Sequence, residues 1–350
     1  MTMKKVRQLW WSQTRGWVIG LSLLMMLIGL VLAVQTTQQK MALSVESKTE
    51  RAQQVKDHQK NPENYLIHGN RVSLKAYRNY QHQFFYADEF KTHGYETTNN
   101  RSNIWFYGVM MLIGLVLAFW GRRTHYYEFL LGLGVTRLQL WCVQVLQVLK
   151  FGIVMGATQF IYWGWIIAII PTKWQRYRNL SGLFGHSVAI TIIGLSILML
   201  SWLIGQTTTH FWLAGLLSFL TWRTINGAVT NSGYTSSILG DGFAPESWFN
   251  AHYYVSASLA GFVTIILLVL TWLSFRCWSG LTRSKINQGI FLVAVVLGFG
   301  ALLGDTLLQP FVYNSGSITP WYEIVGMALM FIVGSFGLWW QRRREVYHAA

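Results

Sequence analysis

The chain has 350 residues, of which 52% are hydrophobic and 12% are charged, with a formal net charge of +15. Soluble proteins average about 25% charged residues, so this composition excludes an ordinary soluble protein and favours one polytopic, all-α membrane domain. The positive charge does not indicate a nucleic-acid partner. No basic tract is interleaved with aromatic residues, and the cations flank apolar segments that face anionic lipid.

Eight windows are apolar over the length of about 20 residues that a transmembrane helix needs. In chain order they are Trp17–Val34, Ile104–Gly121, Leu146–Ile170, Ser187–Gly205, Phe211–Val229, Ala257–Phe275, Gln288–Leu307 and Ile324–Trp340. The fifth window has the weakest pattern, because Arg223 and Asn226 interrupt it. The first follows a basic N-terminus like that of a signal peptide. Its apolar run exceeds the usual ~7–15 residues, which favours an uncleaved span.

Lysine and arginine concentrate in alternate connections between these windows, and the positive-inside rule therefore places both termini in the cytoplasm. Three cations are exceptions, because Lys173, Arg176 and Arg178 fall in a predicted outer connection. The predicted segments are 1–34 (cytoplasmic N-terminus and first span), 35–103 (extracellular), 104–229 (spans two to five, with a cytoplasmic coupling helix at 122–145), 230–256 (extracellular) and 257–350 (spans six to eight and a basic cytoplasmic C-terminus).

Residues 35–103 are the only sizeable soluble stretch, and we expect them to form a small extracellular lobe. A helix is predicted over Thr36–Lys60, which contains no Gly or Pro, with a stop at Asn61-Pro62. The aromatic part around Tyr77–Tyr86 has too few apolar residues for a large core. We therefore expect it to pack on the membrane domain or on a second subunit. Four histidines share no helix face and are interpreted as surface residues rather than metal ligands: His58, His68, His82 and His93.

No catalytic or cofactor motif occurs in the chain. It lacks G-x-x-x-x-G-K-[ST], H-E-x-x-H, C-x-x-C and G-x-S-x-G, so we predict no enzyme activity of its own and no bound ATP or metal. Cys142 and Cys277 fall on the predicted cytoplasmic side, which argues against a disulfide. Arg223 lies within a span and is a candidate contact for an anionic substrate or lipid headgroup. The alternatives are that it extends to the interface or pairs with Asp241 or Asp305.

Two further patterns concern helix packing. Gly152-x3-Gly156 and Gly300-x3-Gly304 are pairs of small residues that allow close approach of helices in a bundle or dimer. Tryptophans at predicted span ends are typical of an interfacial aromatic belt. These are Trp10, Trp11, Trp17, Trp105, Trp120, Trp174, Trp321, Trp339 and Trp340.

The segment 125–137 is a short amphipathic stretch in a predicted cytoplasmic connection. On a helix that starts near its first residue, Phe129, Leu130 and Leu133 form an apolar stripe, whereas Glu128 points elsewhere. Glycines at 132 and 134 then end the helix. Such a helix either rests in the headgroup layer or docks into a groove on a partner protein.

This segment resembles the coupling-helix region of ABC-2 type permeases, the membrane subunits of ABC exporters. Those permeases commonly carry Tyr-Glu-x-Leu-Leu-(small)-Leu-Pro-(Val/Ile)-(Ser/Thr)-Arg after the second span. The residues that match are Tyr127, Glu128, Leu130, Leu131, Gly132, Leu133, Val135, Thr136 and Arg137. Gly134 stands where proline is usual, a departure that bears on the turn. The long stretch between spans one and two also resembles the subgroup with a large first extracellular loop. The resemblance covers roughly residues 1–230, and spans seven and eight are additional to the usual six.

The resemblance implies a helix that fits a groove on a separate ATP-binding subunit. The implied coupling residues are Tyr127, Glu128, Phe129, Leu130, Leu131, Gly132, Leu133 and Arg137. ATP and Mg²⁺ are then expected on that partner, with a second permease, identical or related, completing the membrane part in the plasma membrane. Closure of the ATP-binding subunits would reorient the bundle and move substrate outward. The sequence identifies no substrate among peptides, hydrophobic drugs, lipids and envelope precursors. The rival interpretation is a membrane sensor or scaffold whose outer lobe binds a ligand or envelope component.

Overall fold

The computed structural model describes residues 1–43, 48–67, 70–85, 100–176, 178–230, 253–276 and 285–303, with a few isolated positions between 328 and 335. Nearly all of this is helix, and five of the described helices are long and apolar enough to cross a membrane. The described part of the chain is therefore mainly α-helical and has the composition of a membrane-embedded protein. The five are α1 (Met3–Leu43), α4 (Asn100–Arg123), α6 (Arg137–Ile169), α7 (Leu180–Thr207) and α11 (Tyr253–Arg276).

These five helices contain the first, second, third, fourth and sixth predicted windows. The fifth window and the described part of the seventh are also helical, in α8 (Phe211–Thr230) and α12 (Lys285–Leu303), but neither helix is among the five. The eighth lies almost entirely outside the described residues, so the number of eight spans stays a prediction. Helix α1 has 41 residues, which is about 60 Å, or roughly twice the hydrocarbon thickness of a bilayer. Only its apolar middle can lie in the membrane.

The chain divides into two compact units. The boundaries between them lie within helices and not in the connections between helices. Unit 1 consists of residues 1–21, 107–153 and 191–350, and unit 2 consists of residues 22–106 and 154–190. Helices α1, α4, α6 and α7 each contribute to both units. The segments predicted from the loop charges describe membrane topology, whereas these units describe which residues pack together. The predicted topology stays a prediction.

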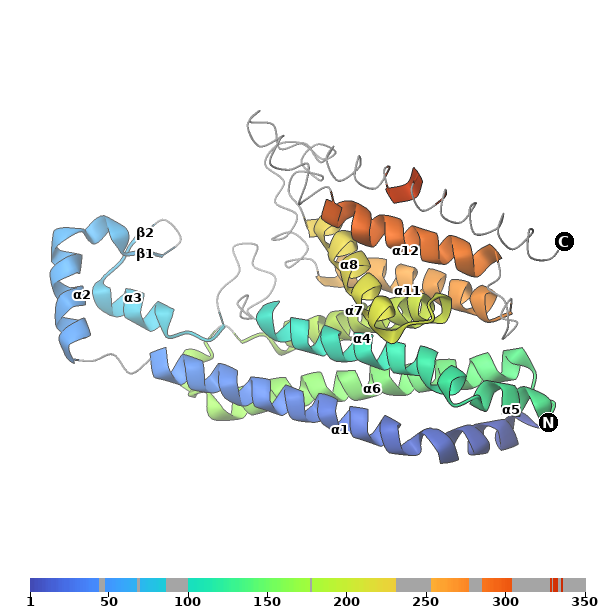
Figure 1. Ribbon diagram of the computed structural model, residues 1–350. Helices are drawn as coiled ribbons and strands as arrows, with labels where there is room; N and C mark the ends of the chain where they lie inside the picture. The colour runs from blue at the N-terminus through green and yellow to red at the C-terminus, as the bar shows by residue number, and fades with distance from the viewer. Residues whose placement is uncertain are drawn as a thin grey trace. The chain divides into compact units, whose positions relative to one another are not determined.

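Close helix contacts in unit 1 depend on small residues, as expected where helices pack without a hydrophobic driving force. A Cβ on Gly114 of α4 would lie 3.0 Å from the backbone nitrogen of Trp202 on α7, so this glycine allows the two backbones to approach. Gly152, from the first predicted small-residue pair, likewise packs against Leu195. Helix α8 runs beside α12 (Figure 1), and Thr224 of α8 donates a hydrogen bond of 2.9 Å to the Leu297 carbonyl.

Unit 2 contains the lobe that follows α1. It comprises α2 (Lys48–Lys60), a 3₁₀ turn (Pro62–Asn64), a two-stranded antiparallel hairpin of β1 (Leu66–Ile67) and β2 (Asn70–Arg71), and α3 (Leu74–Gln81) (Figure 1). Helix α2 ends directly before Asn61-Pro62, as predicted. The hairpin was not predicted, because strands of two residues carry no periodic signal.

The end of the lobe packs on membrane helices of the same unit, which confirms that expectation for the described residues. Phe84 and Phe85 are fully buried and join a core cluster with residues of α1, α6 and α7. The other buried members of this cluster are Ala33, Tyr162, Trp163, Ile166, Ile170 and Leu183.

Candidate docking site at helix α5

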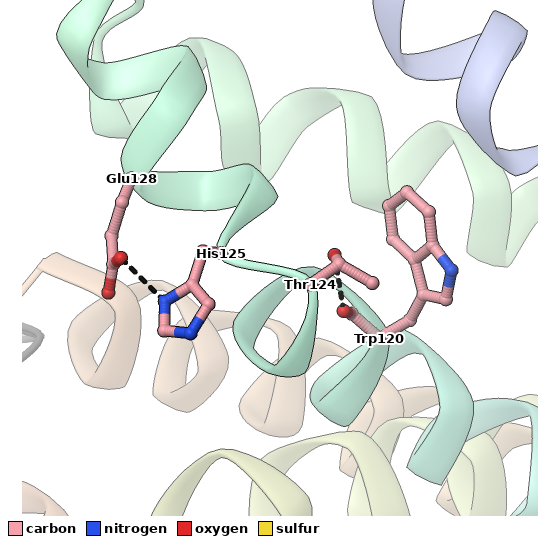
Figure 2. Close-up of polar contacts among 4 residues, drawn as sticks. All are labelled: Trp120, Thr124, His125 and Glu128. Carbon is pink, nitrogen blue, oxygen red and sulfur yellow. Dashed lines mark hydrogen bonds and ion pairs between the residues drawn. The ribbon is translucent and has the colours of Figure 1, made fainter.

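Helix α5 (Tyr126–Gly132) connects α4 to α6 in unit 1. The prediction of one coupling helix at 122–145 is therefore wrong. Its first residues belong to the end of α4, its middle forms α5, and its last residues belong to the start of α6. The chain turns between α4 and α5 at His125, whose φ of 53° is left-handed. Thr124 donates to the Trp120 carbonyl at 2.8 Å, and Nδ1 of His125 lies 2.8 Å from Oε2 of Glu128 (Figure 2). Both side chains of the His125–Glu128 pair are exposed, so the contact orients the turn but stabilises it by less than about 1 kcal/mol.

The C-terminal end of α5 is a Schellman motif, which favours glycine at its left-handed position. Gly134 has a φ of +80° and donates to the Leu131 carbonyl at 3.0 Å, while Val135 donates to the Leu130 carbonyl at 3.1 Å. The buried side chains of Leu130 and Val135 supply the apolar contact that accompanies this motif. A proline at 134 would have its φ near −65° and would lack the amide donor. The departure from the family pattern is therefore a difference in backbone conformation.

The first turn of α6 is fixed by a reciprocal capping box. The Thr136 amide donates to Oε1 of Gln139 at 3.0 Å, and the Gln139 amide donates to Oγ1 of Thr136 at 3.2 Å. Nε2 of Gln139 also donates to the Met1 carbonyl at 3.0 Å. Next to this cap, the guanidinium of Arg137 donates to the Arg276 carbonyl at 2.7 Å, at the C-terminal end of α11. Arg137 therefore joins α6 to α11, a role that the sequence did not predict.

Two of the predicted coupling residues face inward. Tyr127 and Leu130 are buried, and the hydroxyl of Tyr127 donates to the Leu117 carbonyl at 2.9 Å. The Tyr127 ring stacks on Trp10 at 5.9 Å between centroids and meets Phe275 edge-on at 5.7 Å. Burial raises the pKa of the Tyr127 phenol well above its ordinary value, and the charge of Arg122 offsets only part of that rise. Tyr127 is therefore a neutral hydrogen-bond donor that holds α5 in place.

Trp10 is the main residue of this site that the sequence did not indicate. It was predicted to lie in an interfacial belt, but it is 1% exposed. Its ring contacts Trp120, Tyr126 and Tyr127 with centroid distances of 5.7–5.9 Å. Tyr126 also donates to the Leu9 carbonyl at 2.9 Å. The N-terminal turns of α1 are thus the support on which α5 rests.

The outward face of α5 is partly apolar. Phe129 and Leu133 are 54% and 49% exposed, and Leu138 at the start of α6 is 50% exposed. The predicted stripe of Phe129, Leu130 and Leu133 is therefore wrong as a single face, because Leu130 points into the core. We call the exposed residues Glu128, Phe129, Gly132, Leu133 and Leu138 the α5 face.

The remaining candidates lie elsewhere. Arg223 is exposed on α8, and its predicted partners Asp241 and Asp305 lie outside the described residues. A small cavity beneath α5 is lined by Ala118, Arg122, Tyr127, Gln206, Ser274, Phe275 and Asn287. Arg122 donates there to the carbonyls of Gly205 and Gln206 in the last turn of α7 and of Thr208 directly after it. No group of three His, Cys, Asp or Glu in the described part of the chain is placed to hold a metal.

Comparison of the chain with models of known protein families, with curated proteins and with solved structures finds no match.

Proposed function

We propose that this protein is the membrane subunit of an ATP-driven exporter and that the α5 face docks on a separate ATP-binding subunit. The observation that carries the proposal is the two-sided construction of α5. Its inner side is fixed by Tyr127 and Leu130, while its outer side presents Phe129 and Leu133. A short helix that is rigidly held and exposes large apolar side chains suits docking into a groove.

The contacts of α5 also suit the transmission of force. Tyr126 is bonded to the backbone of α1, Tyr127 to that of α4, and the adjacent Arg137 to that of α11. Movement of a partner bound to the α5 face would therefore displace several helices of unit 1 together. Packed helices respond to such displacement as rigid bodies, which is the motion that reorients a substrate pathway.

The proposal includes the topology predicted from the loop charges: eight spans in the cell membrane, both termini in the cytoplasm and the lobe outside. ATP and Mg²⁺ would bind the partner subunit and not this chain. A second permease would complete the transporter, and Arg223 is the candidate contact for an anionic substrate or lipid. No nucleic-acid partner is part of the proposal.

The test is affinity purification of the tagged chain from its native cells in mild detergent, followed by mass spectrometry. A stoichiometric subunit with a nucleotide-binding P-loop is expected. The double variant F129D/L133D should reduce recovery of that subunit at least tenfold, while the chain itself stays inserted and folded. Leu66→Asp is the matched control, because Leu66 is also an exposed apolar residue (43%) but lies in the lobe. Equal recovery with F129D/L133D and wild type would refute docking at the α5 face.

A membrane sensor or scaffold is the second candidate, and the ordered lobe favours it. The rings of His58, Tyr65 and Tyr77 meet edge-on in a continuous row, with centroid distances of 4.8 and 5.0 Å. Such a row of aromatic contacts gives the lobe a fixed surface for a ligand. The same purification separates the two candidates, since a sensor needs no ATP-binding subunit. If none is recovered even after crosslinking, the exporter proposal fails and the sensor becomes the leading interpretation.

A further inference from the structure

Lys150 is an exposed cation on an apolar face of helix α6, in unit 1. Leu146 and Ile153 lie one turn before it and one turn after it on the same face, and both are exposed. Helix α6 is long and apolar enough to cross a membrane, so an exposed apolar face on it is a surface for lipid. A cation at such a position is a candidate for a functional contact.

The length of α6 sets the depth of Lys150 in the membrane. The helix continues from Lys150 to Ile169, which corresponds to a rise of about 29 Å. This matches the hydrocarbon thickness of a bilayer, about 30 Å. The apolar run of α1 begins at Trp17, whose ring stacks on Phe151 at 6.1 Å between centroids. Both helices therefore enter the hydrocarbon at the same level, and Lys150 lies at the boundary with the headgroups.

Helix α1 brings a tryptophan and a second cation to the same place. Nζ of Lys150 lies 4.2 Å from the ring centroid of Trp11, a cation–π contact that fixes the position of the ammonium group. Arg7 lies one turn earlier on the same face of α1, is also exposed, and is close enough for its charge to act on Lys150. Beside these residues, Gln147 donates a hydrogen bond of 3.4 Å to Thr14. The two cations are therefore brought together by the packing of α1 on α6.

No acidic side chain in the described part of unit 1 compensates these two cations. Glu128 is the only Asp or Glu among those residues, and its carboxylate lies 2.8 Å from Nδ1 of His125. Within the described part of the chain, the side chains of Arg7 and Lys150 form no ion pair and no hydrogen bond. Their like charges repel each other, and the repulsion is stronger next to hydrocarbon than in water. An anion between them would remove it.

We propose that Arg7, Trp11 and Lys150 form a binding site for the headgroup of an anionic phospholipid, with the two cations as its phosphate ligands. The ammonium of Lys150 has three donors, and contact with one ring leaves donors for phosphate. The guanidinium of Arg7 is a planar fork that suits phosphate. The acyl chains would lie along the exposed apolar face of α6, next to Ile153. The ligand is a lipid and not a soluble phosphate, because the cations border this face. The site shares no residue with the α5 face.

The test is native mass spectrometry of the full chain in detergent, titrated separately with phosphatidylglycerol and with phosphatidylcholine. Wild type should retain phosphatidylglycerol selectively. Each cation at a membrane surface contributes roughly fivefold to affinity for anionic lipid, so the variant R7Q/K150Q should bind it at least about tenfold more weakly. The matched control K5Q/R123Q removes the same charge from exposed positions of unit 1 and should bind like wild type. Lys5 is two residues from Arg7 and therefore lies on the other side of α1.

Circular dichroism checks that each variant keeps wild-type helix content. If R7Q/K150Q does not, the single variants R7Q and K150Q decide, and each should bind phosphatidylglycerol about fivefold more weakly. Trp11→Leu should also weaken binding, because it removes the ring that positions the ammonium while both charges stay.

Three results would overturn the proposal. The first is unchanged lipid retention by R7Q/K150Q or, where that variant does not fold, by both single variants. The second is equal weakening in K5Q/R123Q, which would show that total charge and not this site attracts the lipid. The third is displacement of the lipid by glycerol 3-phosphate at equal concentration, which would assign the site to a soluble phosphate.

Discussion

The ring of Tyr127 lies against the backbone of Gly121, in the space that a side chain at residue 121 would occupy. A Cβ on Gly121 would come within 2.5 Å of Cδ1 of that ring. Gly121 is in the last turns of α4 and Tyr127 is in the first turn of α5, so this contact sets how closely the short helix folds back onto the helix before it. The exposed position of Phe129 follows from that placement.

Gly121→Ala is expected to lower stability, because the added methyl group cannot fit without moving the Tyr127 ring. Overpacking of this kind typically costs about 1–3 kcal/mol. The measurement is the midpoint of thermal unfolding in detergent. Gly132→Ala is the control, because Gly132 lies on the next helix, α5, with nothing within 4 Å of an added Cβ, and alanine favours helix. Equal midpoints for the two variants would show that the Tyr127 ring does not confine residue 121.

Substitutions at Gly134 should follow the tolerance of each residue for a positive φ, since no atom lies within 4 Å of a Cβ there. Alanine is expected to cost about 1 kcal/mol and asparagine less. Proline should be the most harmful, because it cannot adopt the φ of +80° and removes the amide that bonds to Leu131. Thermal unfolding of the three variants gives the order. Wild-type stability of Gly134→Pro would show that residue 134 does not need the positive φ or the amide bond to Leu131.

The bounds of α5 were predictable from the sequence, because they depend on local chemistry. The glycine at 134 and the Thr136–Gln139 cap are short-range signals that end one helix and start the next. The orientation of α5 was not predictable. In a helix of seven residues with apolar side chains on both sides, periodicity cannot distinguish the buried face from the exposed one. The choice is made by Trp10 and Phe275, which are distant in sequence and reach α5 only in the folded chain.

The same reasoning applies to the wider fold. Long apolar windows gave the positions of α1, α4, α6, α7 and α11, because hydrophobic length is a strong signal. The close approach of α4 and α7 at Gly114 carried no recognisable motif. The role of Arg137 was also hidden, since a carbonyl at the end of another helix is invisible in the sequence.

Alkaline pH should destabilise the protein through Tyr127. Its folded pKa is raised by burial above the ordinary value of 10.0, so the unfolded chain loses this proton first as pH rises. The contribution of the neutral Tyr127 phenol to the free energy of unfolding is complete below about pH 10 and is lost as pH increases beyond it. Tyr127→Phe should lower the unfolding midpoint at pH 8, since it loses the bond to Leu117, worth about 1 kcal/mol. Between pH 9 and pH 11, the unfolding midpoint of Tyr127→Phe should then decrease less than that of wild type. Parallel pH profiles would contradict a buried neutral phenol at this position.

Substitution of Arg137 can show whether this residue stabilises the fold or contacts the partner subunit. The resemblance implies contact with the ATP-binding subunit, whereas the structure bonds its guanidinium to the Arg276 carbonyl at the end of α11. If the bond to α11 is its main function, Arg137→Gln should lower the unfolding midpoint modestly. The effect should be below about 1 kcal/mol because the residue is exposed. Partner recovery should then fall only in proportion to that loss of stability. Arg123→Gln removes an exposed cation at the same end of unit 1 and is the control. A wild-type midpoint combined with complete loss of the partner would instead make Arg137 part of the docking surface.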